Sequence, residues 1–121
     1  MNPRRVHDLM RRYFPKIDGA EHEWVVVVDE AGLRREVLEA LLGKIVPAEE
    51  LIVEVHRKIG GMVPRAAAIA MVAKHVGRGD IRIADRKFTG FLVVLRSGVA
   101  TGWTEINADA EIDYQDETIS H

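Results

Sequence analysis

The sequence predicts a single α+β domain over residues 1–121, with helices packed against one face of a mostly antiparallel sheet built from a C-terminal meander. Apolar residues recur at helical spacing through most of the chain before Gly77, whereas from Asp80 onward apolar and polar residues alternate with a period of two. Ser97-Gly98 joins two strand-like runs and predicts a tight hairpin. A 121-residue chain with 47% apolar residues is long enough for one core of ordinary size.

The first helix is predicted over residues 3–14. Asn2 is a suitable N-cap, and Pro3 fits the first helical position, where a missing N–H costs nothing. Pro15 ends the helix, and the arginines fall off the apolar stripe, where water solvates them. The stripe consists of Val6, Leu9, Met10, Tyr13 and Phe14.

The valine run 25–28 predicts a buried central strand, because it is too short for a helix and β-branched throughout. Two further helices are expected, over residues 33–45 and 64–76. The first presents an apolar face, and the second ends at Gly77. The apolar face of the first consists of Leu33, Val37, Leu41 and Ile45, widened by Leu38 and Leu42.

Residues 48–59 leave helix and strand as alternatives. The β-branched Ile52, Val53 and Val55 favour a strand. The charge order, with two glutamates first and three basic residues last, matches a helix dipole, and Gly60 would cap its end. On this order we expect a helix.

Residues 104–121, here called the acidic segment, hold six carboxylates and no Lys or Arg. From position 105 to 115 the odd positions are polar and the even positions mostly apolar, as in a strand with one face packed and one in water. A disordered tail has no reason to keep this register. We therefore expect an acid-faced strand or arm, with only the last few residues frayed.

Motifs for chemistry are missing from the sequence. Without cysteine, disulfides and thiolate sites are excluded, and no zinc, phosphate-loop or nucleophile-elbow pattern occurs. We predict no catalytic residue, no metal and no cofactor. The alternative is a small metal-dependent phosphodiesterase or hydrolase, although the usual acid-x-lysine pair is missing. Its residues would be His75, Asp80, Asp85 and Lys87.

The N-terminus has no apolar core of a signal peptide, and no run approaches the roughly 20 apolar residues of a membrane span, so we expect a cytoplasmic protein without membrane partners. Net charge is −2, with arginines concentrated at the N-terminus and acids at the C-terminus. The acidic end would repel phosphate, which disfavours nucleic acid as a partner.

The cysteine-free α+β pattern, the hairpin "GFLVVLRSGVATGW" and the acidic strand after it resemble small bacterial immunity proteins of contact-dependent growth inhibition and other polymorphic toxin systems. The resemblance implies a cytoplasmic inhibitor that binds one toxin domain 1:1, often a basic nuclease, and masks its active site or substrate groove. A self-associating regulatory domain is a further alternative. The expected partner-binding residues are Trp103, Glu105, Asp109, Glu111, Asp113, Tyr114, Asp116 and Glu117.

Overall fold

A computed structural model describes residues 1–17, 22–56, 58–105 and 112. The described helices are α1 (Pro3–Tyr13), α2 (Arg35–Ile45) and α3 (Arg65–His75). The strands are β1 (Val25–Val26), β2 (Val28–Asp29), β3 (Gly32–Leu33), β4 (Glu50–His56), β5 (Ile59–Pro64), β6 (Ile81–Ala84), β7 (Gly90–Val94) and β8 (Val99–Thr104). One antiparallel sheet has the order β1-β8-β7-β6-β4-β5, and β2 pairs with β3 separately, which confirms the predicted α+β class.

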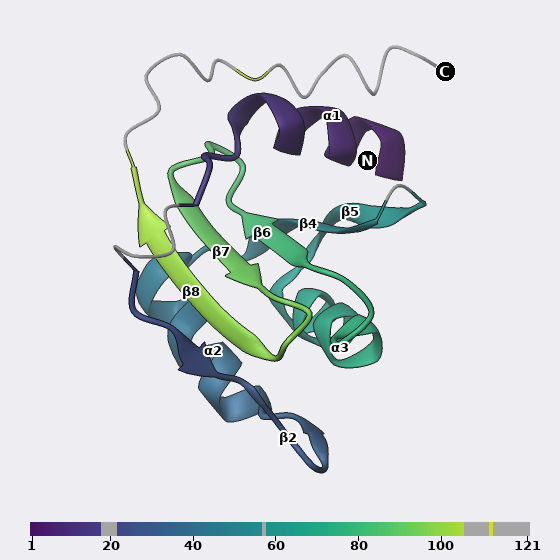
Figure 1. The fold of residues 1–121 in the computed structure, drawn as a ribbon. Coiled ribbons are helices and arrows are strands. Elements are labelled where there is room, and N and C mark those ends of the chain that lie inside the picture. Colours follow the sequence, from purple (N-terminus) through teal and green to yellow (C-terminus); the bar gives the residue numbers. More distant parts are fainter. Residues whose placement is uncertain (18–21, 57, 106–111, 113–121) are drawn as a thin grey trace.

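Helices cover both faces of the large sheet, so the expectation that they share one face is wrong. Alternate residues of β4 enter two separate apolar clusters: Leu51 and Val53 join the cluster under α2 and α3, and Ile52 joins the one under α1. Figure 1 shows α1 on one side of the sheet and the other two helices on the opposite side. The strong apolar stripe of α1 needs a surface of its own, and the sheet supplies one.

The local signals of α1 are confirmed. Asn2 Oδ1 accepts a hydrogen bond from the Arg5 N–H at 2.8 Å, and Val6 and Leu9 are buried. The helix lies close to β5 because Gly60 has no side chain: a Cβ there would stand 2.9 Å from the Val53 carbonyl oxygen and 3.3 Å from Val6 Cγ1. Docking of α1 therefore depends on a glycine in the neighbouring edge strand.

The expected helix over residues 48–59 is wrong, because Glu50–His56 forms strand β4. β4 pairs with β5 on one side and with β6 on the other. Leu51, Ile52 and Val53 are consecutive and fully buried, which requires apolar cover on both faces, as a central strand provides. Burial of this run outweighs the weak preference that the charge order gives to a helix.

The valine run does not form the predicted central strand. It divides into β1 and β2 at the margin of the fold, and β1 pairs only with β8. Val27 is fully buried, whereas the Val26 side chain is 57% exposed. A run of β-branched residues indicates extended backbone, but it does not show whether one or both faces of the strand are covered by other elements.

The remaining elements agree with the sequence. Helices α2 and α3 form close to their predicted bounds, but α2 begins at Arg35, and Leu33, predicted as the first residue of its apolar face, lies in β3 instead. The fully buried positions of α2 are Leu38 and Leu42. The β7–β8 hairpin turns at Ser97-Gly98, where Gly98 has φ +93°, a region that favours glycine. Within the described ranges, no helix has both the length and the apolar character of a membrane span.

Candidate functional site

The end of strand β8 carries the two predicted partner-binding residues that the structure describes, Trp103 and Glu105. Antiparallel pairing of β8 with β7 places Trp103 opposite Phe91, and Glu105 follows directly after β8. The other predicted partner-binding residues lie outside the described residues. They are Asp109, Glu111, Asp113, Tyr114, Asp116 and Glu117.

Trp103 is half-buried among other rings. Its centroid lies 5.7 Å from that of Phe14 in an edge-to-face arrangement, 5.8 Å from Phe91 and 4.7 Å from His22. The indole Nε1–H donates to Glu105 Oε2 at 3.2 Å. Trp103 therefore ties the segment after α1 to the sheet, and its polar edge is oriented toward the exposed carboxylate of Glu105.

Glu105 borders a hollow beside the β6–β7 turn. The backbone N–H of Glu105 donates to the Thr89 carbonyl at 2.8 Å, which holds the residue at this place. The hollow has two carboxylates and an apolar wall. Its lining residues are Ile45, Pro47, Asp85, Thr89, Gly90, Thr104 and Glu105.

Asp85 organises the turn on which the hollow rests. Its Oδ1 accepts from the Thr89 N–H at 2.8 Å, and its Oδ2 accepts from the Thr89 hydroxyl at 2.6 Å. Phe88 within this turn has φ +53°, an unusual value for a residue with a side chain, and its ring is fully buried in the cluster under α1. Burial of that ring and the Asp85 hydrogen bonds together hold the turn in place.

The residues of the alternative metal-dependent enzyme are not brought together. Asp80 and Asp85 stand at opposite ends of β6, and Asp80 Oδ1 accepts from the Arg96 N–H at 2.9 Å. His75 lies buried on α3, and its pKa is lowered by desolvation first and then by the charges of Lys74, Arg78 and His56. Among the described residues, no three His, Asp or Glu side chains are placed to hold a metal ion together.

A polar cluster under α1 was not predicted from the sequence. The Glu54 side chain is only 7% exposed; its Oε2 lies 2.8 Å from His7 Nδ1, and its Oε1 accepts from Arg82 at 2.9 Å. The Arg82 guanidinium also lies over the Phe14 ring, 5.8 Å from its centroid. Reading residues 50–56 as a strand would have placed Glu54 on the face that α1 covers.

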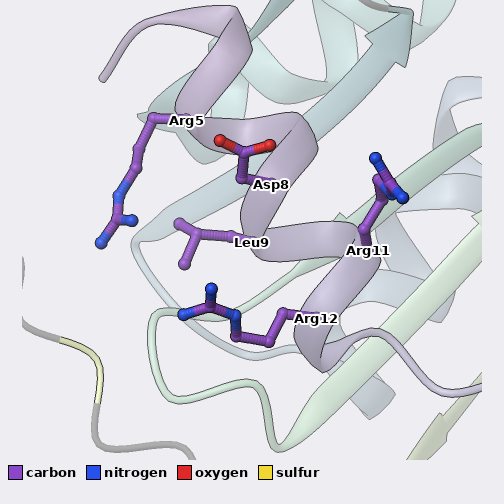
Figure 2. Close-up of a pocket in the computed structure, with 5 residues that line it drawn as sticks. All are labelled: Arg5, Asp8, Leu9, Arg11 and Arg12. Carbon is purple, nitrogen blue, oxygen red and sulfur yellow. The ribbon is translucent and has the colours of Figure 1, made fainter.

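Two arginines of α1 flank the buried Leu9 on one side of the helix, and we call this pair the arginine face. Figure 2 shows Arg5 and Arg12 extending from the same side of the helix with Leu9 between them, while Arg11 points to another side. Spacings of three and four residues produce this arrangement. Of the described residues, none forms an ion pair with these arginines. The arginine face consists of Arg5 and Arg12.

Comparisons with protein-family models, with curated proteins and with solved structures found no match to this chain.

Proposed function

We propose that the protein is a cytoplasmic binding protein that neutralises a cognate toxin domain, as immunity proteins of contact-dependent growth inhibition do. The toxin domain would be basic and nuclease-like, bound 1:1, with its active site or substrate groove masked. The observation that carries the proposal is the hollow at the end of β8, in which Glu105 and Asp85 stand next to Ile45 and Pro47.

The hollow suits a lysine or arginine side chain. Such a side chain packs its methylene stem on apolar surface and keeps its charged end near carboxylates. Ile45 and Pro47 provide the apolar wall, and the exposed Glu105 provides the first carboxylate. Asp85 adds negative charge close by, although its oxygens already hold the turn.

The residues that follow Glu105 in the sequence are also rich in acids. Five further acids follow Glu105 with no intervening cation. A surface of one sign speeds the encounter with a partner of the opposite sign and rejects partners of like sign. Trp103, whose indole N–H donates to Glu105, supplies an aromatic group beside that carboxylate, a residue type that contributes much of the binding energy at interface centres.

The test is co-expression with the product of the adjacent reading frame. We expect a 1:1 complex and rescue of growth when that product is toxic. Glu105→Lys should weaken the complex, while Glu39→Lys, an equal charge change at an exposed position on α2, should not. If the adjacent product is not toxic, or Glu105→Lys binds as well as Glu39→Lys, the proposal fails.

A further inference from the structure

The residues that follow α1 border a hollow over the middle of β6, here called the α1–β6 hollow. Its volume is about 380 Å³, within the range of about 300–1,000 Å³ that is typical of small-molecule sites. Phe14 has extended backbone and Pro15 cannot continue the helix, so the chain leaves α1 at this point. None of the lining residues that the structure describes is an acid. They are Phe14, Pro15, Lys16, Ile17 and Arg82.

The apolar wall of the α1–β6 hollow consists of Phe14, Pro15 and Ile17, and ring contacts hold Phe14 in place. The Phe14 centroid lies 5.2 Å from that of Phe91 and 5.7 Å from that of Trp103, edge-to-face in both cases. Both partners belong to the paired strands β7 and β8. The wall is therefore fixed by the fold, without any need for a ligand to order it.

Arg82 enters the hollow as a cation that is already ordered. Its Nη1 donates to Glu54 Oε1 at 2.9 Å, and its guanidinium lies over the Phe14 ring, 5.8 Å from the centroid. Glu54 is itself buried, and its other oxygen lies 2.8 Å from His7 Nδ1. A guanidinium has five N–H donors, and among the described residues Glu54 is the only hydrogen-bond partner of Arg82, so donors remain for a ligand. Because the side chain is already held, binding would cost little further entropy.

The charges around the hollow match a monoanion. Lys16 is exposed, and within the described ranges no carboxylate forms an ion pair with it. Lys16 and Arg82 supply one positive charge each, Glu54 supplies one negative charge, and one positive charge is left over when His7 is neutral. A carboxylate carries one negative charge, and its planar pair of oxygens fits the fork of a guanidinium.

We propose that the α1–β6 hollow binds a small organic carboxylate. The carboxylate group contacts Arg82 and Lys16, and the hydrocarbon part of the ligand packs on the apolar wall. The inference goes beyond the proposed function, because its occupant is a small molecule and it needs no toxin. Of the described residues, none lines both this hollow and the one beside Glu105.

The test is titration of the full chain with benzoate, followed by the amide NMR signals of Ile17 and Arg82. We expect these signals to shift and to saturate, with a dissociation constant on the order of 1 mM for so small a ligand. Benzyl alcohol has a similar size and no charge, so it should bind at least about tenfold more weakly if the two cations recognise the carboxylate.

A pair of variants with equal charge changes makes the test specific. Lys16→Gln should weaken benzoate binding by about fivefold or more, because it removes one of the two cations. Arg12→Gln removes an exposed cation that lines a different hollow on α1, and it should leave benzoate binding unchanged.

A third variant tests the planar fork of Arg82. Arg82→Lys keeps the positive charge beside Glu54 but loses the fork, so benzoate binding should weaken again. Urea unfolding shows whether this variant keeps its fold. Lys16→Gln does not touch the contacts of Glu54, so the comparison with Arg12→Gln stays decisive if Arg82→Lys destabilises the protein.

Three results would overturn the inference. One is the absence of saturable shifts at Ile17 and Arg82 in the wild-type protein. Another is binding of benzyl alcohol as tightly as benzoate, which would make the hollow an apolar surface without anion recognition. The third is equal benzoate affinity of the Lys16→Gln and Arg12→Gln variants.

Discussion

At the scale of single residues, the most consequential side chain is a buried acid rather than an exposed one. Glu54 is held by His7 from α1 and by Arg82 from β6, and no buried side-chain polar atom among the described residues is left without a partner. This arrangement was not predictable, because the charge pattern around Glu54 fits a helix and its burial depends on strands far along the chain. Nearby residues such as Asn2 and Gly98 were predictable, since their roles depend only on local backbone geometry.

Replacing Glu54 should destabilise the fold. Glu54→Ala removes the acceptor of two hydrogen bonds, and we expect a loss of about 1–3 kcal/mol, below the value for fully buried pairs because His7 and Arg82 are partly exposed. Glu50→Ala, on the same strand but exposed, should change stability by less than about 0.5 kcal/mol. Urea unfolding of both variants measures the difference; equal stabilities would contradict a structural role for Glu54.

His75 should make stability depend on pH. Because desolvation, and then Lys74, Arg78 and His56, lower its pKa below 6.5, the unfolded chain takes up a proton more readily than the folded one. The contribution of His75 is therefore complete above pH 6.5 and is lost as the pH falls from there toward the folded-state pKa. Between about pH 7.5 and about pH 5.5 the wild-type protein should lose more unfolding free energy than His75→Gln. Identical losses would contradict this account.

At the scale of elements, local sequence signals predicted some helices and turns correctly, and burial determined the elements that they did not predict. α1 was predictable because its cap, proline and apolar stripe all lie within fourteen residues. β4 was not, because its charge order suits a helix and its burial as a strand depends on β5 and β6. The valine run was not, because only the sheet order distinguishes a central strand from an edge. The acid-faced strand predicted after Thr104 lies mostly outside the described residues, so that prediction stays open.

The docking of α1 on the sheet can be measured directly. Leu9 is 2% exposed and packs in the cluster with Ile52, so Leu9→Ala should cost about 2–4 kcal/mol. Arg12→Ala, on the exposed side of the same helix, should stay within about 0.5 kcal/mol. Thermal or urea unfolding gives both values. A loss below about 1 kcal/mol for Leu9→Ala would mean that α1 is an appendage rather than a layer of the fold.

At the scale of the whole molecule, the large sheet separates α1 from α2 and α3, and its two faces carry different charged groups. On the side of the sheet that α1 covers lie the arginine face, the buried Glu54 and the contact of Ile112. The end of β8 carries Glu105 beside the hollow of the β6–β7 turn. The proposed neutralisation of a basic toxin depends on Glu105 and on the acids that follow it in the sequence.

The most direct test of the proposed function is the rate of association between this protein and the product of the adjacent reading frame. Replacing Asp109, Glu111 and Asp113 by Asn, Gln and Asn removes three negative charges that would steer a basic partner. We predict a slower association at low salt, and a difference from wild type that shrinks as ionic strength rises. An association rate equal to that of wild type at low salt would contradict the account and leave the acids with no role in partner binding.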